Sequence, residues 1–277
     1  MFAGCTSSIE GSDYVIVGVP FDKTESFRSG ASDAPEKIRY YSYSFEPYMM
    51  EYEVSLSDIQ VCDVGDIDKN DSVQEMGEEL KEVLRTVIES KKFPIVLGGE
   101  HSLTSFAVDA CSSVYDDLQV FVLDAHLDYR DEYEGNQWSH ATVNRRISEL
   151  DIGKLAVAGV RSMSEGEKKG SPEFITASEV NLNDEEFLKK IKKEFCGDVY
   201  LSIDMDVIDP AFAPGVGNPE PYGLLPRQVK YIIESLSDNL VGIDMVEVTP
   251  KYDHADTTSI LASKFVYNLL GSKSRTQ

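Results

Sequence analysis

The chain has 277 residues, of which 42% are hydrophobic and 27% are charged, proportions typical of a globular protein that exclude extensive disorder. Its formal net charge of −23 argues against a nucleic-acid partner and suits a small cationic ligand, although a solvated acidic surface accounts for most of this charge. No apolar run approaches the roughly 18 residues that a membrane span needs, and residues 1–13 lack the features of a signal peptide. We therefore expect a cytoplasmic protein with no membrane partner.

In chain order, the expected elements alternate between strand and helix. They are strand 14–19, a helix from about residue 33, strand 59–64, helix 73–90, strand 94–97, a helix ending near residue 110, strand 120–128, helix 140–150, strand 155–160, helix 184–195, strand 199–206, helix 226–236, strand 240–248 and helix 254–270. The strands are apolar without alternation, so both of their faces should be covered. This pattern predicts an α/β fold with a mainly parallel sheet and helices on either side. No convincing linker interrupts it, and we expect one domain over residues 1–277.

Local signals refine two of these expectations. Ser32 or Asp33 can cap the first helix, and Pro35 is tolerated in its first turn. The four cysteines have no CxxC spacing and lie outside the polar clusters, so we expect free buried thiols in a reducing compartment. They are Cys5, Cys62, Cys111 and Cys196.

Polar clusters follow two of the apolar strands. One run ends in Asp124, His126 and Asp128, and the other ends in Asp204 and Asp206. Residues two apart in extended backbone share a face, so each set should point in one direction. Several uncompensated charges at the end of a buried strand are costly unless cations or partners neutralise them. A metal site explains both clusters.

A third cluster, GGEHS at residues 98–102, places His101 in a tight turn after a strand. With the other clusters it gives two imidazoles, four carboxylates and no sulfur, a ligand set suited to hard divalent ions such as manganese. Six side chains are more than one catalytic ion uses, so we expect two metal ions that activate a shared water for hydrolysis. Any one of these residues alone would more often be a cap, turn or core residue.

The motifs together resemble the ureohydrolase family, which contains the arginases and agmatinases. The resemblance covers about residues 14–265 and is carried by blocks in the family's order: GVPFD at 18–22, GGEHS at 98–102, DAHLD at 124–128, SH at 139–140, SIDMDVIDPAFAPGVGNPEPYG at 202–223 and EVTPKYD at 247–253. It implies a three-layer α/β/α fold of the arginase and deacetylase type. It also implies a dimanganese hydrolase that cleaves a guanidino group to urea and an amine by attack of a metal-bridging hydroxide.

Carried over by position, the resemblance implies a role for each motif residue. One ion would be held by His101, Asp124, Asp128 and Asp204, and the other by Asp124, His126, Asp204 and Asp206. His140 matches the histidine proposed to shuttle protons, and Glu247 matches the carboxylate that holds the guanidinium. Asp128 would also accept a hydrogen bond from the hydroxide. We expect Asp209 and Asp253 to brace loops, and His254 to be structural.

The loop at residues 129–141, YRDEYEGNQWSHA, resembles the agmatinase pattern and lacks the arginase features. Asp131, Glu132 and Glu134 suit an amine tail, which favours agmatine as substrate and putrescine as product. Arg130 could instead pair with the carboxylate of a guanidino acid such as 4-guanidinobutyrate, although a solvent-facing role is the simpler expectation. The chain would then be a guanidinobutyrase, and arginase activity is a further alternative.

Three residues depart from the family's usual pattern: Glu100 stands where Asp is common, Ala141 where Gly is usual and Val143 where Pro is usual. None removes a ligand, but the last two affect the substrate mouth near His140. Acetyl-amine hydrolysis, as in the metal deacetylases, is a more distant enzyme alternative, because those enzymes use a different ligand set around one zinc. A catalytically silent metal-binding homologue is the non-enzyme alternative. The resemblance also implies a homo-oligomer, either a trimer or a hexamer.

Overall fold

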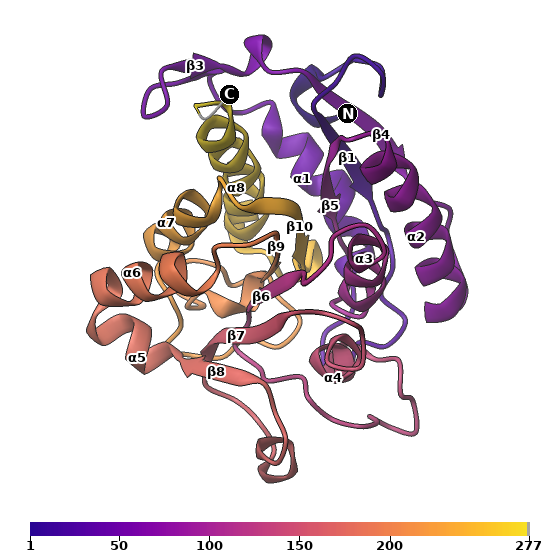
Figure 1. The fold of residues 1–277 in the computed structure, drawn as a ribbon, viewed down its shortest axis with the longest axis vertical. Coiled ribbons are helices and arrows are strands. Elements are labelled where there is room, and N and C mark those ends of the chain that lie inside the picture. The colour runs from indigo at the N-terminus through magenta and orange to yellow at the C-terminus, as the bar shows by residue number, and fades with distance from the viewer. Residues whose placement is uncertain (276–277) are drawn as a thin grey trace.

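The computed structural model describes residues 1–275, and its centre is an eight-stranded sheet in the order β4-β1-β5-β10-β9-β6-β7-β8 (Figure 1). Every neighbouring pair of these strands is parallel. The strands are β1 (Tyr14–Gly18), β4 (Val61–Asp66), β5 (Phe93–Leu97), β6 (Gln119–Leu123), β7 (Lys154–Val160), β8 (Glu173–Thr176), β9 (Val199–Asp204) and β10 (Leu240–Val246). The predicted parallel sheet is therefore confirmed.

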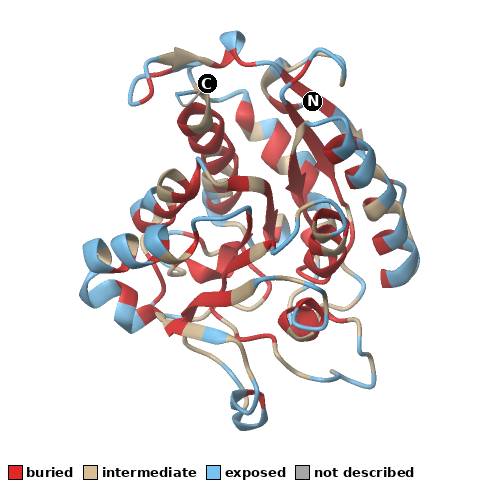
Figure 2. Cartoon of the chain, viewed as in Figure 1, coloured by how far each residue is buried: buried red, intermediate tan, exposed pale blue. Residues whose placement is uncertain are grey.

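Helices cover both faces of the sheet and complete a three-layer arrangement (Figure 1). One face packs against α1 (Ala34–Ser42), α5 (Ala177–Leu182), α6 (Asp184–Glu194), α7 (Pro226–Leu236) and α8 (Thr257–Ser274). The other face packs against α2 (Val73–Glu89), α3 (Leu103–Ser112) and α4 (Val143–Ile147). Buried residues line the strands and the inner helix faces, whereas the outer helix faces are exposed (Figure 2).

Alternate residues of each strand enter the two cores. In β6, Phe121 and Leu123 belong to the core beneath α5–α8, and Val120 and Val122 belong to the core beneath α2–α4. Successive side chains of a strand point to opposite faces, so a strand covered on both sides must be apolar throughout. This explains why the strands lack alternation in the sequence.

Several predicted boundaries are wrong by a few residues, most of them beside the polar clusters. β6 ends at Leu123 rather than residue 128, and β9 ends at Asp204, where a 3-10 helix (Met205–Val207) follows. The helix predicted over 140–150 is a 3-10 turn (His140–Thr142) and the short α4. Strand β8, helix α5 and the small antiparallel pair β2 (Tyr48–Met49) and β3 (Val54–Ser55) were not predicted.

Helix caps only partly follow the predictions. Asp33 is the N-cap residue of α1, but its side chain makes no capping hydrogen bond. The Ser32 hydroxyl instead donates to Asp22, at 2.8 Å, and Pro35 lies in the first turn as expected.

The cysteines are free, but only Cys62 and Cys111 are buried, and Cys196 is exposed, contrary to prediction. Within residues 1–275, no helix is both long and apolar enough to cross a membrane.

Helices α2 and α3 approach closely at Gly77. A Cβ atom on Gly77 would lie 2.3 Å from Cδ1 of Phe106 on α3. Phe106 cannot move freely, because its ring stacks on Trp138 with centroids 5.0 Å apart. Trp138 belongs to the loop that leads to His140. This contact therefore connects the helix layer to the polar edge of the sheet.

Gly77→Ala should destabilise the protein by about 1–3 kcal/mol, because overpacking outweighs the gain of roughly 1 kcal/mol that alanine brings to a helix. Urea unfolding measures this change. Gly166→Ala is the matched control, because a Cβ atom there meets nothing within 4 Å. A Gly77→Ala protein as stable as the wild type would show that Phe106 and Trp138 can rearrange at little cost.

Candidate metal centre and substrate pocket

Polar side chains gather where β5, β6, β9 and β10 end. These four strands are neighbours in the sheet, and all run in the same direction. Their carboxyl ends therefore meet at one edge, which is where open α/β sheets bind ligands. The loops after β5, β6 and β10 carry His101, Asp124 and Glu247, and Asp204 is the last residue of β9.

The turn between β5 and α3 depends on Gly99. A Cβ atom at Gly99 would lie 1.9 Å from the carbonyl oxygen of Phe21, so only glycine permits this approach. The next residue, Glu100, donates its N–H to the same oxygen at 2.8 Å. The turn holds the loop after β1 against the loop after β5 and places His101 at the end of the sheet.

His101 is fully buried and faces three carboxylates. Its Nδ1 atom lies 3.2 Å from Asp124 Oδ2, 3.3 Å from Asp204 Oδ2 and 3.6 Å from Asp128 Oδ2. One ligand atom from each of His101, Asp124 and Asp128 lies within 4.8 Å of the other two. This arrangement can hold one metal ion.

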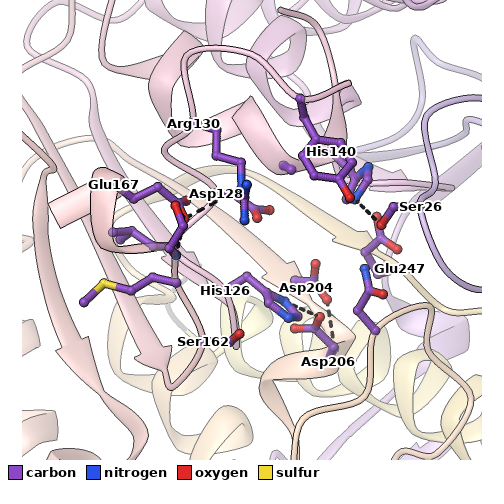
Figure 3. A pocket seen from close by; sticks show the side chains of 16 residues that line it. Ser26, His126, Asp128, Arg130, His140, Ser162, Glu167, Asp204, Asp206 and Glu247 are labelled. Carbon is purple, nitrogen blue, oxygen red and sulfur yellow. Dashed lines mark hydrogen bonds and ion pairs between the residues drawn. The ribbon is translucent and has the colours of Figure 1, made fainter. Parts of the chain in front are cut away.

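His126 forms a second group that shares Asp124. Its Nδ1 atom lies 2.9 Å from Asp206 Oδ2 and 3.6 Å from Asp124 Oδ1. Asp124, His126 and Asp206 again offer atoms within 4.8 Å of one another. Figure 3 shows His126 beside Asp206, with Asp204 close to them on the pocket wall. The structure thus brings together all six side chains that the sequence selected.

The local geometry differs from the extended backbone that we predicted. Asp128 has a φ of +47°, which is unusual for a residue other than glycine, and Asp206 lies in the 3-10 helix after β9. Short turns, rather than strand alternation, therefore bring these side chains to the site. Asp124 Oδ1 accepts the N–H of His126 at 2.6 Å, and Asp204 Oδ1 accepts that of Asp206 at 2.8 Å.

The charges of the cluster need neutralisation. Burial would raise the pKa of Asp124, but the imidazoles of His101 and His126 hold it below its usual value. Burial and the Asp124 charge raise the pKa of Asp128 to about 7, while burial, Asp206 and Asp124 raise that of Asp204 well above its usual range. Two imidazoles therefore cannot stabilise all the carboxylates in their charged form.

Two buried atoms in the cluster also lack partners. Among the described residues, neither His101 Nδ1 nor Asp124 Oδ2 makes a hydrogen bond of satisfactory geometry, although the two atoms are 3.2 Å apart. Buried polar atoms without partners are rare in native proteins and require an explanation. Carboxylate oxygens and imidazole nitrogens without sulfur suit hard divalent ions. The residues present therefore fit a pair of such ions.

A buried network behind the cluster orients His101, and the sequence analysis missed it. His101 Nε2 lies 3.1 Å from Ser202 Oγ, which donates to Asp244 Oδ1 at 2.6 Å. Tyr200 donates to the other oxygen of Asp244 at 2.9 Å. Partners of this kind fix the ring of a metal-binding histidine. Ser202 and Tyr200 lie in β9, two and four residues before Asp204, where strand alternation could have indicated them.

Glu247 follows β10 and is buried in the same pocket. Its φ is +64°, and its Oε1 atom accepts the N–H of His101 at 2.7 Å. Burial, together with the nearby Glu25 and Glu100, raises the pKa of Glu247 well above its usual range. A buried carboxylate in this state favours a cation beside it.

His140 lies on another wall of the pocket and is also buried. Its Nε2 atom is 3.3 Å from Ser26 Oγ (Figure 3). Its ring meets that of Tyr133 edge-on, with centroids 5.7 Å apart. Burial lowers the pKa of His140 to about 4, so the ring is neutral near pH 7.

The cavity bounded by these residues has a volume of about 210 Å³. Arg130 lines it and is 41% exposed, with its guanidinium 5.2 Å from the Tyr133 ring and its Nε 3.8 Å from Glu167 Oε2. Arg130 therefore has partners in the pocket and does not simply face solvent. Further lining residues that the sequence analysis missed are Ser26, Tyr133, Ser162, Met163, Ser164, Glu167 and Asn218.

The acidic residues expected to receive an amine tail do not line this cavity. Asp131, Glu132 and Glu134 are exposed, and Asp131 pairs with Arg146 at 3.3 Å. The carboxylate on this wall belongs instead to Glu167, which the sequence analysis did not select. Its oxygens accept hydrogen bonds from the N–H groups of Tyr129 and Ser164.

The remaining candidates have structural positions. Asp209 accepts the N–H groups of Ala211 and Gly223, and Asp253 accepts those of Thr258 and Ser259, so both brace loops as expected. His254 is exposed and outside the pocket. Of the departures from the family pattern, Glu100 is buried and accepts hydrogen bonds from Thr24 and Ser102. Ala141 and Val143 are also buried and follow His140 in the chain.

Comparison with known proteins agrees with this site. The chain matches the Arginase family over residues 12–271. The chain belongs to the arginase family. Agmatinase of Bacillus cereus is 38% identical over 95% of this chain and 92% of its own length. The agmatine ureohydrolase of Thermoplasma volcanium superposes with a TM-score of 0.92 at 36% identity, covering 98% of this chain and 93% of that one. The proclavaminate amidino hydrolase of Streptomyces clavuligerus gives a TM-score of 0.91 at 31% identity, covering 100% and 97%.

In this arginase-family protein, removing the shared ligand should lower the number of bound metal ions more than removing an unshared ligand. Asp124→Ala should lose most of both ions, because Asp124 belongs to both groups, whereas His126→Ala should retain about one ion per chain. Elemental analysis of protein equilibrated with excess metal and then desalted measures this stoichiometry. Asp209→Asn, which alters a loop brace only, is the control. Equal losses in the Asp124 and His126 variants would contradict the shared-ligand arrangement.

Proposed function

We propose that this chain is an agmatinase-like hydrolase, which cleaves the guanidino group of agmatine to urea and putrescine with two Mn²⁺ ions. One observation carries the proposal. Two candidate metal-binding groups, each with a histidine and two carboxylates, share Asp124 and lie at the cavity that the buried carboxylate of Glu247 also lines. The match to proteins named agmatinase and agmatine ureohydrolase supports the choice of substrate.

The metal ligands in this proposal are the six clustered side chains. One ion would be held by His101, Asp124, Asp128 and Asp204, and the other by Asp124, His126, Asp204 and Asp206. When bound, the ions would lower the pKa of a water molecule and supply the nucleophile at neutral pH. The chain's contribution is to fix the ions against the wall that binds the substrate.

Glu247 would bind the planar guanidinium group. Its carboxylate is buried and, among residues 1–275, accepts one hydrogen bond, from the N–H of His101, so it can accept further bonds from a bidentate cation. Glu247 lines the same cavity as Asp128 and Asp204 (Figure 3), so a guanidinium held there would lie beside the proposed metal ligands. Binding therefore also orients the substrate for attack.

His140 would manage the proton that the reaction requires. Water adds its oxygen to the guanidino carbon, the bond from that carbon to the alkyl nitrogen breaks, and the alkyl nitrogen must gain a proton. The neutral imidazole of His140 can take a proton and deliver it to that nitrogen. Asp128, close to His101, is the carboxylate that we propose accepts a hydrogen bond from the attacking group.

Some parts of the proposal concern the whole protein. We propose that residues 1–277 act as one ureohydrolase domain in the cytoplasm, in a homo-oligomer that is a trimer or a hexamer, with no nucleic-acid partner. The ligand set argues against a deacetylase-like single-zinc site, because two groups share Asp124. A silent metal-binding homologue stays as the non-enzyme alternative, since ligands can bind metal without turnover.

Urea release by manganese-loaded protein should occur with agmatine and be much slower with arginine or 4-guanidinobutyrate. Chelation should abolish it, and Glu247→Gln should lower kcat/KM by about 10²-fold or more, because a charge-assisted hydrogen bond to the guanidinium is lost. Colorimetric urea detection measures each rate, and Asp209→Asn is the control.

Each other outcome has a distinct meaning. Preference for 4-guanidinobutyrate would keep the metal site and make the protein a guanidinobutyrase, and preference for arginine would make it an arginase. No urea from any of the three substrates, with manganese bound, would refute the agmatinase proposal and support the silent homologue.

Arg130 tests the charge of the substrate's tail. A cation at the pocket mouth repels an ammonium and attracts a carboxylate, so Arg130→Ala should leave the KM for agmatine unchanged or lower it. The same change should raise the KM of any residual 4-guanidinobutyrate activity. Arg145→Ala is the matched control, because Arg145 lies outside the pocket and pairs with Glu149 at 3.0 Å. A rise in the KM for agmatine alone would contradict this role.

A further inference from the structure

Thr24, in the loop after β1, connects Glu100 to His140. Its hydroxyl donates to Glu100 Oε1 at 2.5 Å, and its N–H donates to Glu100 Oε2 at 2.6 Å. The same hydroxyl oxygen accepts the N–H of His140 at 3.0 Å and lies 3.4 Å from His140 Nδ1. Thr24 does not line the cavity, so its role is indirect.

The Thr24 hydroxyl can act toward the His140 ring in only one way. A hydroxyl has one proton, and the short bond to the buried Glu100 carboxylate uses it. Toward His140 Nδ1 the oxygen can therefore only accept. Ser139 Oγ, which already accepts the N–H of Ala141 at 3.4 Å, lies 3.3 Å from the same Nδ1 and can accept as well. The Ser139 hydroxyl can also donate, so it is the Thr24 contact that favours a neutral ring with its proton on Nδ1.

We propose that Thr24, held by Glu100, is a positioning residue that fixes His140 as the Nδ1–H tautomer and leaves Nε2 unprotonated, so that this atom can take up a proton. The inference rests on the proposed hydrolysis, in which His140 moves a proton. Nε2 lies 3.3 Å from Ser26 Oγ, and both residues line the cavity (Figure 3). A histidine's second nitrogen is commonly fixed in this way by the partner of the first.

Glu100 makes this arrangement rigid. It is fully buried and also accepts the Ser102 hydroxyl at 2.6 Å, and its own N–H is bonded to Phe21. It is adjacent to His101, so one turn of the chain holds both a metal ligand and the anchor of Thr24. The distance between the proton-transfer ring and the metal centre is thereby set by a few short hydrogen bonds.

Kinetics with agmatine and manganese-loaded full-length protein test the positioning role. Thr24→Val keeps the shape of the side chain but removes the hydroxyl, so kcat should fall about tenfold or more while KM changes less than about twofold, since misplaced acid–base groups lose rate rather than binding. Thr24→Ser, which restores the hydroxyl, should recover most of kcat. Thr86→Val is the control, because Thr86 is exposed on α2.

Nitrogen NMR tests the tautomer directly. In the full-length protein labelled with ¹⁵N-histidine and loaded with diamagnetic Zn²⁺, the His140 signals, assigned by comparison with His140→Asn, should show a protonated Nδ1 and an unprotonated Nε2 near pH 7. In Thr24→Val this preference should weaken, and in Thr24→Ser it should persist. This readout does not depend on turnover.

The two readouts separate the possible failures. A proton on Nε2 in the wild type, or wild-type kcat in Thr24→Val, overturns the inference. If Thr24→Val does not fold, the wild-type spectrum still shows whether His140 carries its proton on Nδ1, as the inference requires. If the wild type releases no urea, the proposed function fails, and the spectrum still decides whether Thr24 fixes the tautomer.

Discussion

The constraint on which the structure depends is the burial of several carboxylates where parallel strands end. Asp124, Asp204 and Asp206 are almost fully inaccessible to solvent, and two imidazoles cannot neutralise them together with Asp128. Burying such charges without partners would cost more than a domain can supply, since net stabilities are only about 5–15 kcal/mol. The cluster can lie beside apolar strands because cations can neutralise its negative charge. The stability of the fold and the occupancy of the metal centre are therefore linked.

A second group of carboxylates lies beside the first and behaves differently. Glu100 is surrounded by donors from Thr24 and Ser102, which satisfy it within the protein. Within the described part of the chain, Glu247 receives one hydrogen bond, from the N–H of His101, in spite of its burial. A buried anion that the protein leaves incompletely satisfied is a place for an external cation. Glu100 belongs to the turn after β5, and Glu247 is hydrogen-bonded to the same turn, so the difference in hydrogen bonding separates a structural carboxylate from a binding one in neighbouring positions.

The sequence predicted which strands end in site residues, but it predicted the local geometry of those residues less well. Apolar runs located the central strands, and the polar residues after them identified the cluster of six, because strand ends meet at one edge of a parallel sheet. The turns that aim Asp128 and Asp206 were not predictable from alternation, since they depend on hydrogen bonds formed only after folding. Thr24 and Ser26 come from the loop after β1, and no local motif marks them, whereas Glu167 follows Ser164 in a capping box that signals a helix start and not a pocket.

The acidic loop after β6 shows why the mouth of the pocket is harder to predict than its floor. Composition suggested that Asp131, Glu132 and Glu134 face the substrate, but exposed side chains are free to turn toward solvent or toward Arg146. Arg130 and Glu167 are constrained instead, by the Tyr133 ring and by backbone N–H groups. Constrained side chains can discriminate between ligands, because their reorganisation is costly. Specificity for the substrate's tail is therefore expected to depend on the few mouth residues that have partners, and not on the number of charges that the loop carries.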